Sequence, residues 1–127
     1  INKYINLIKK DFKINEEKTK PFIKKLDKNI EILSKFSDWI KEKMKNSKDD
    51  VSAACNDYLK VLGLVATAHA WMKVLEASFK DYENNKEFYE EKIETAHFFF
   101  NRVLPRVESY YLTATSGSKY IMDFKFN

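Results

Sequence analysis

A long apolar stripe in the middle of the chain constrains its fold more than any other feature. Between Val51 and Tyr82, apolar residues recur at alternating spacings of three and four, which places them on one side of a helix. A helix of this length, about 48 Å, can bury such a stripe only against other long helices. The sequence therefore predicts a helical bundle with this segment at its centre. The ten positions are Val51, Ala54, Tyr58, Val61, Val65, Ala68, Met72, Leu75, Phe79 and Tyr82.

A second apolar face lies beside this stripe on the same helix. An apolar surface on two sides indicates that the middle of the helix is covered by more than one neighbour. The small residues around Gly63 would allow a neighbouring helix to approach closely. The second face consists of Cys55, Leu59, Leu62, Ala66 and Ala70.

The preceding segment predicts a helix that starts near Asn15, which can cap free amides, with Pro21 in its opening turns. The polar break at 46–50 ends it, and Ser47, Asp49 and Asp50 are each possible caps for the central helix. The predicted buried stripe of this helix is Ile23, Leu26, Ile30, Leu33, Ser37, Ile40 and Met44.

The segment after the central helix carries one apolar stripe that runs past Pro105. Proline disrupts helical hydrogen bonding, but the period stays in phase on both sides, which predicts a kinked helix rather than two separate ones. The polar connection at 83–86 is short, and short connections imply antiparallel neighbours. The stripe consists of Tyr89, Ile93, Ala96, Phe100, Val103, Val107, Tyr110 and Ala114.

These segments predict an all-α fold, an antiparallel up-and-down bundle of three long helices plus a short N-terminal helix. We expect residues 15–127 to form a single bundle domain and residues 1–14 to be a linker or the end of a preceding helix. The chain begins with Ile1 rather than Met, so we expect it to be part of a longer protein. The short N-terminal stripe consists of Ile1, Ile5, Ile8 and Phe12.

Composition indicates a cytoplasmic, soluble domain with no stable membrane insertion. The longest apolar run, within 61–68, is far below the about 20 residues that span a bilayer. The single cysteine, Cys55, fits a reducing compartment and excludes a multi-cysteine metal site. His69 and His97 stand in strongly apolar helices, which favours core or interface positions over catalysis or metal binding. We therefore predict no catalytic residue, no metal site and no cofactor-binding residue in this chain.

Charge is distributed unevenly along the chain. Residues 1–48 hold fourteen lysines against seven acidic residues, while the whole chain carries a net charge of +4. A basic first half can bind a nucleic acid or an anionic membrane surface, so a free-standing basic helical module is the alternative interpretation. The lysines are interleaved with acidic residues such as Asp27, Glu31 and Asp38, a pattern typical of a solvated helix face, and this favours no nucleic-acid partner.

Three segments in order resemble one known family. The strings SDWIKEK (37–43), DYLKVLGLVATAHAWMKVLEA (57–77) and KEFYEEKIETAHFFFNRVLPRV (86–107) are similar to the helical C-terminal extension of a branch of acyl-CoA dehydrogenases. The resemblance covers about residues 20–127. Its matching positions are Trp39, Tyr58, Leu59, Gly63, Leu64, Trp71, Phe88, Tyr89, Lys92, Ala96, Phe99, Leu104 and Pro105.

The resemblance implies a role that depends on a larger enzyme. In such enzymes a catalytic core binds FAD and acyl-CoA, a core glutamate removes a proton and the flavin accepts hydride. None of these core residues belongs to this chain, so the expected role is an accessory domain that packs on the catalytic core of the same polypeptide or on another subunit of a homo-oligomer, and that helps to shape the acyl-CoA entrance. The aromatic residues that the main stripes do not use are the candidate interface: Trp39, Trp71 and Phe98.

Overall fold

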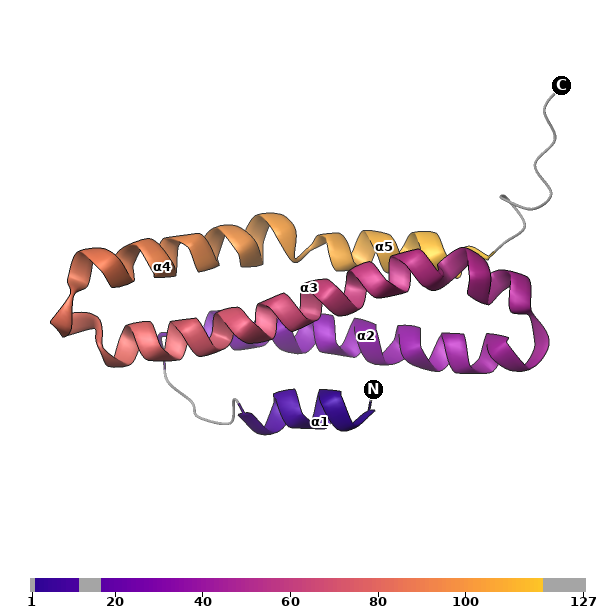
Figure 1. Ribbon diagram of the computed structural model, residues 1–127, viewed down its shortest axis with the longest axis horizontal. Helices are drawn as coiled ribbons and strands as arrows, with labels where there is room; N and C mark the ends of the chain where they lie inside the picture. Colours follow the sequence, from indigo (N-terminus) through magenta and orange to yellow (C-terminus); the bar gives the residue numbers. More distant parts are fainter. Residues whose placement is uncertain (1, 12–16, 118–127) are drawn as a thin grey trace, which may run out of the picture.

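The computed structural model describes residues 2–11 and 17–117, without the side chains of 8–11. Three long arms run up and down, α2, then α3, then α4 with α5, each antiparallel to the arm before it, and the short α1 lies along them (Figure 1). This confirms the predicted all-α bundle. The helices are α1 (Asn2–Asp11), α2 (Lys20–Asn46), α3 (Lys48–Lys80), α4 (Lys86–Phe98) and α5 (Arg106–Thr115).

A single residue, Ser47, joins α2 to α3. Its backbone N–H donates to the carbonyl oxygen of Lys43 at 2.7 Å, and its hydroxyl accepts from the backbone N–H of Asp50 at 3.4 Å. Ser47 therefore closes one helix and caps the next, as one of the three caps predicted for this break. The connection is so short that α2 and α3 must pack side by side.

The start of α2 differs in position from the prediction. The helix begins at Lys20, with Thr19 before it and Pro21 in the first turn, where proline is tolerated because its missing N–H would be unsatisfied anyway. The predicted cap, Asn15, lies outside the described residues, as do Ile1, Phe12 and the side chain of Ile8.

A 3₁₀ turn, Tyr82–Asn84, connects α3 to α4. Asn85 then caps α4, because its side-chain oxygen accepts from the backbone N–H of Phe88 at 3.3 Å. The connection is short and polar, as the sequence indicated, and it returns the chain along α3.

The third arm is interrupted near Pro105, where one kinked helix was predicted: α4 and α5 are two α-helices that follow each other along the same arm. Leu104 and Pro105 between them keep right-handed helical backbone angles. The connection contains a feature that the sequence did not predict, a π-helical turn at Phe99–Val103, in which the N–H of Leu104 donates to the carbonyl oxygen of Phe99 at 2.8 Å. This five-residue spacing rotates the following residues relative to the preceding ones. The first two residues of this turn, Phe99 and Phe100, are both buried.

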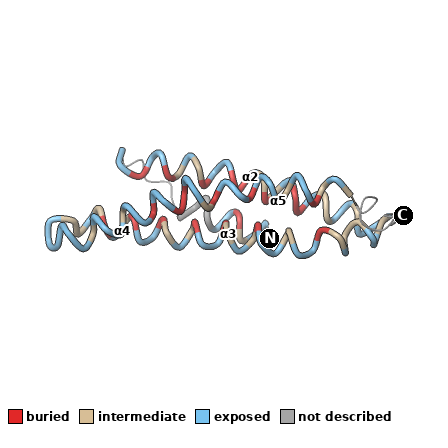
Figure 2. Tube along the Cα trace, turned by 90° about the horizontal axis from the view of Figure 1, so that it is seen from above, coloured by how far each residue is buried: buried red, intermediate tan, exposed pale blue. Residues whose placement is uncertain are grey.

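The core lies between the three arms, and buried positions follow their inner sides (Figure 2). Phe36 is its aromatic centre, and its ring meets the rings of Tyr58 at 5.1 Å and Tyr111 at 5.5 Å between centroids. These contacts join α2 to both α3 and α5. The largest fully buried side chains are Leu26, Ile30, Leu33, Phe36, Val61, Val65, Met72, Leu75, Phe100, Leu104 and Val107.

Two details at the ends of the bundle complete the comparison with the predicted stripes. Met44 is 63% exposed, so the prediction that it is buried was wrong. It lies in the last turn of α2, where the chain is already turning into α3.

The short helix α1 packs on the bundle through the buried Ile5 and through Tyr4, whose ring meets that of His69 at 6.0 Å between centroids.

Candidate functional site

The three aromatic residues proposed as an interface lie on three different helices. Trp39 on α2 and Trp71 on α3 are half-buried and pack against the core, whereas Phe98 on α4 is 60% exposed. The ring of Phe22, near the start of α2, meets that of His97 at 4.6 Å, so Phe98 lies at the level of Phe22. Trp39 is seventeen residues further along α2, about 25 Å away along the helix axis. Phe98 and Trp39 therefore do not form one continuous patch.

The surroundings of the two tryptophans show why they are only partly available. The ring of Trp39 meets that of Phe36 at 6.2 Å, and the Lys43 ammonium lies 5.9 Å from its centroid. Trp71 is part of the layer that covers the buried residues of α3. Both side chains thus contribute to the fold in addition to any contact with a partner.

Phe98 belongs to an exposed hollow on the outer side of α4. The hollow is lined by Phe98, Glu91, Glu94 and Thr95, all of them exposed. The Phe98 ring is 60% exposed among these carboxylates, and an exposed large apolar side chain of this kind often marks a contact surface. Phe98 is therefore the proposed interface residue with the most accessible side chain.

A groove of about 530 Å³ lies at the end of the bundle where α3 turns into α4. Its apolar part includes Phe79, and the Lys18 ammonium lies 5.8 Å from the centre of that ring. At its rim, the phenol of Tyr82 donates to a carboxylate oxygen of Glu90 at 2.5 Å. This bond favours the protonated phenol and raises the pKa of Tyr82 above the ordinary value of 10.0, and burial and the negative charge of Glu90 add to the increase.

The groove brings together groups that the sequence did not connect. Phe79 and Tyr82 were predicted as core residues, and Glu90 and Glu94 as solvated helix charges, but the turn at Tyr82–Asn84 places them around one depression with His97. Their proximity depends on the turn geometry, for which the sequence carries no signal beyond the polar run. The groove therefore combines positive, negative and aromatic groups.

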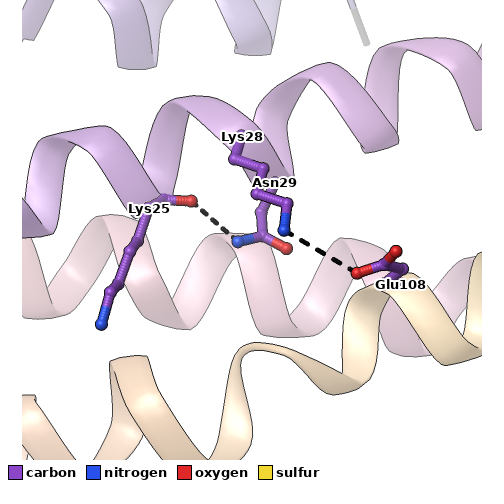
Figure 3. A network of polar contacts seen from close by, with 4 residues as sticks. All are labelled: Lys25, Lys28, Asn29 and Glu108. Atoms are coloured by element: carbon purple, nitrogen blue, oxygen red, sulfur yellow. Dashed lines mark hydrogen bonds and ion pairs between the residues drawn. The ribbon is translucent and has the colours of Figure 1, made fainter.

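Several lysines of α2 contact polar or acidic groups on neighbouring helices. Lys28 faces Glu108 of α5 at 3.8 Å, and Lys25 donates from its ammonium to the side-chain oxygen of Asn101. The side-chain amide of Asn29, the residue after Lys28, donates to the backbone carbonyl oxygen of Lys25 at 2.7 Å (Figure 3). Nearer the hairpin, Lys43 lies 3.6 Å from Asp50 of α3. Part of the positive charge of the first half thus complements the acidic second half across the bundle, as exposed ion pairs that are individually weak.

The second apolar face of α3 is not covered in the described structure. Cys55, Ala66 and Ala70 are exposed, Leu59 is 64% exposed and Leu62 is half-buried. The central helix does pack against more than one neighbour, as predicted, but these neighbours do not cover its second face. The reason lies in the number of arms: α2 and the α4–α5 arm both pack toward the main stripe of α3, and no described helix reaches its opposite side.

Metal and membrane sites were also assessed on the described part of the chain. Within residues 2–11 and 17–117, no group of three or more His, Cys, Asp or Glu side chains is arranged to hold a metal ion. In the same residues, no helix combines the length and the apolar character needed to cross a bilayer.

Comparisons with known proteins point to one family. No curated protein and no solved structure matches the chain. A family model, described as acetyl-CoA dehydrogenase C-terminal like, matches residues 2–125. This match extends from α1 through the whole bundle. The chain therefore belongs to the acetyl-CoA dehydrogenase C-terminal-like family.

Proposed function

We propose that this chain is the accessory C-terminal helical domain of an FAD-dependent acyl-CoA dehydrogenase in the cytoplasm. The observation that carries the proposal is the family match over residues 2–125, which includes every described helix. In this role residues 15–127 form the domain, which packs on the catalytic core of the same polypeptide within a homo-oligomer and helps to shape the acyl-CoA entrance. It carries out no catalysis on its own.

The N-termini of α3 and α4 do not suit a flavin pyrophosphate. A flavin pyrophosphate is held by glycine-rich loops and free N–H groups at helix N-termini. Here α3 opens with Asp49 and Asp50 and α4 opens with Glu87, so these ends carry negative charge that repels phosphate. We assign FAD and acyl-CoA chemistry to the catalytic core, on the basis of the family match, and packing contacts and the shaping of the entrance to this chain.

Phe98 supports packing on the core through the outer side of α4. Its ring is 60% exposed, and burying it against a partner removes apolar surface from water. Trp39 and Trp71 would add their exposed edges to separate contacts.

The first test asks whether the chain is part of a flavoenzyme. An antibody raised against the chain is used to follow the native protein in a cell extract. We expect one polypeptide several times heavier than 15.1 kDa, which co-purifies with flavin absorbance and acyl-CoA oxidation. A native band near 15.1 kDa without flavin would refute the proposal.

A second test addresses the packing surface in the full-length polypeptide. Phe98→Glu should accelerate release of the bundle by limited proteolysis, because a buried carboxylate without a partner is unfavourable. The matched control is Phe88→Glu on the same helix, where Phe88 is 47% exposed and lies about 15 Å further along the axis. Equal release rates for the two variants would assign the packing surface elsewhere.

The exposed lysines of α2 favour one alternative function, a free-standing basic module that binds anionic membranes or nucleic acid. Lys20, Lys24, Lys35 and Lys41 are all exposed. Such binding would weaken steeply with salt. Co-sedimentation with anionic vesicles, and titration of labelled duplex DNA at two salt concentrations, distinguish this alternative from the accessory-domain role, for which we expect no binding at physiological salt.

A further inference from the structure

The outer side of α3 carries a second regular stripe, opposite the core. Its positions alternate at spacings of three and four along nearly the whole helix, and every one of them is exposed. The middle of the stripe is apolar and its ends are polar or charged. The ten positions are Asp49, Ser52, Asn56, Leu59, Gly63, Ala66, Ala70, Lys73, Ala77 and Lys80.

Gly63, at the centre of this stripe, has open space beside its α-carbon in the described structure. A β-carbon added there would meet nothing within 4 Å, and its backbone does not have a positive φ. Glycine is among the poorest residues for the interior of a helix, so neither packing nor backbone geometry accounts for it. A glycine does permit close approach of another backbone.

The order of charges along the stripe indicates what covers it. The acidic end is at Asp49, and the basic end is at Lys73 and Lys80. A parallel second copy would set Asp49 against Asp49 and Lys80 against Lys80. An antiparallel second copy sets each Asp49 against the Lys80 of its partner, so the surface complements itself only in that orientation.

The sizes of the side chains fit the same antiparallel register. When Asp49 faces Lys80, the two central layers pair Leu59 with Ala70 and Gly63 with Ala66. The large side chain of Leu59, now 64% exposed, then lies against a small one, and the glycine lies where the two helices come closest. Large-to-small pairing of this kind is how facing helices interdigitate.

We propose that α3 pairs with α3 of a second copy of this chain in an antiparallel two-fold dimer centred between Gly63 and Ala66. The stripe is about 46 Å long and one helix, about 10 Å, wide, which gives roughly 460 Å² per copy. Stable interfaces bury about 800 Å² per partner. The dimer is therefore weak, and it forms at micromolar or higher concentration.

The experiment is sedimentation velocity of the 127-residue chain over a concentration series. The core of the bundle is built from its own helices, so the chain can be studied as it is. We expect the mass to rise from 15.1 kDa toward twice that value with concentration. A mass that stays at 15.1 kDa up to millimolar concentration overturns the proposal.

Variants locate the interface and its direction. Ala66→Arg should abolish association, while Ser109→Arg, at an exposed position of α5, should leave it unchanged; circular dichroism verifies that both remain helical. Asp49→Lys or Lys80→Asp alone should weaken the dimer by about tenfold, and the double swap should restore it. Association that survives Ala66→Arg, or a double swap that fails to restore it, excludes this antiparallel surface. These measurements use the 127-residue chain without a catalytic core. Failure of the dimer proposal would therefore not contradict the proposed accessory role, which is tested separately.

Discussion

At the rim of the groove, the contact between Tyr82 and Glu90 changes the pKa of the phenol. The hydrogen bond from Tyr82 to Glu90 holds the phenol in its protonated form, which raises its pKa above 10.0. Because the pKa of Tyr82 is higher in the folded than in the unfolded chain, its hydrogen bond contributes fully to stability only below the unfolded pKa. This contribution is lost as the pH rises through the folded pKa.

We therefore predict that Glu90→Gln lowers the pKa of Tyr82 toward 10.0, because it removes the acceptor carboxylate that is the main cause of the increase. Ultraviolet titration of the phenolates, with Tyr82→Phe to identify the signal, measures the change. An unchanged titration curve in Glu90→Gln would show that the bond does not form in solution.

Phe36 and Phe98 provide a contrast between a buried and an exposed ring. Phe36 is fully buried among rings from neighbouring helices, so Phe36→Ala should lower the free energy of unfolding by about 3–5 kcal/mol. Phe98→Ala, at a position that is 60% exposed, should change it by less than about 0.5 kcal/mol. Urea unfolding monitored by circular dichroism compares the two. Similar losses for both would contradict the described core.

At the scale of the helix, substitution by alanine should change the free energy of unfolding in opposite directions at the two glycines of the chain, Gly63 and Gly117. Gly63→Ala should stabilise the monomer by about 0.5–1 kcal/mol, because the added methyl group meets nothing and alanine favours the helix. Gly117 has a φ of 90°, and Asp50 lies 3.5 Å from the place of an added β-carbon. Gly117→Ala should therefore destabilise by about 1 kcal/mol.

Thermal unfolding at a concentration where the chain is monomeric measures both effects. Destabilisation by Gly63→Ala under these conditions would mean that Gly63 has a packing role within the monomer.

The third arm shows what the sequence can and cannot predict about an element. Its apolar period predicted that one arm runs past Pro105, and the proline predicted a disturbance of the helix at that place, because both signals act locally. The π-turn at Phe99–Val103 was not predictable in this way, since three consecutive phenylalanines fit either helical register. Burial of both Phe99 and Phe100 depends on how α2 and α3 lie against the arm, which is a tertiary effect.

The surface of the bundle was less predictable than its core. The main stripes of all three arms were identified because burial imposes a period on the sequence. The second apolar face of α3 was also identified, and it was expected to be covered, although the described helices leave most of it exposed. Likewise Trp39 and Trp71 were chosen because they lie off the main stripes, yet both pack partly against the core. Sequence period alone does not say which apolar face is covered within the chain.

At the scale of the whole molecule, the three arms share one core and should unfold together. Phe36 contacts rings on both α3 and α5, so no arm can leave without exposing the others. We predict one cooperative transition, with coincident melting curves from far-ultraviolet and near-ultraviolet circular dichroism. Two separate transitions would show that α4 and α5 form an independent unit.

The one-residue link at Ser47 also bears on how the bundle folds. Contacts between α2 and α3 can form in order outward from this link, beginning with residues that are close in sequence and ending with those furthest apart. When contacts form in this order, each new contact closes only a short additional loop. Chains dominated by such local contacts fold in microseconds to milliseconds. The α2–α3 hairpin can therefore serve as the nucleus, on which the α4–α5 arm docks last.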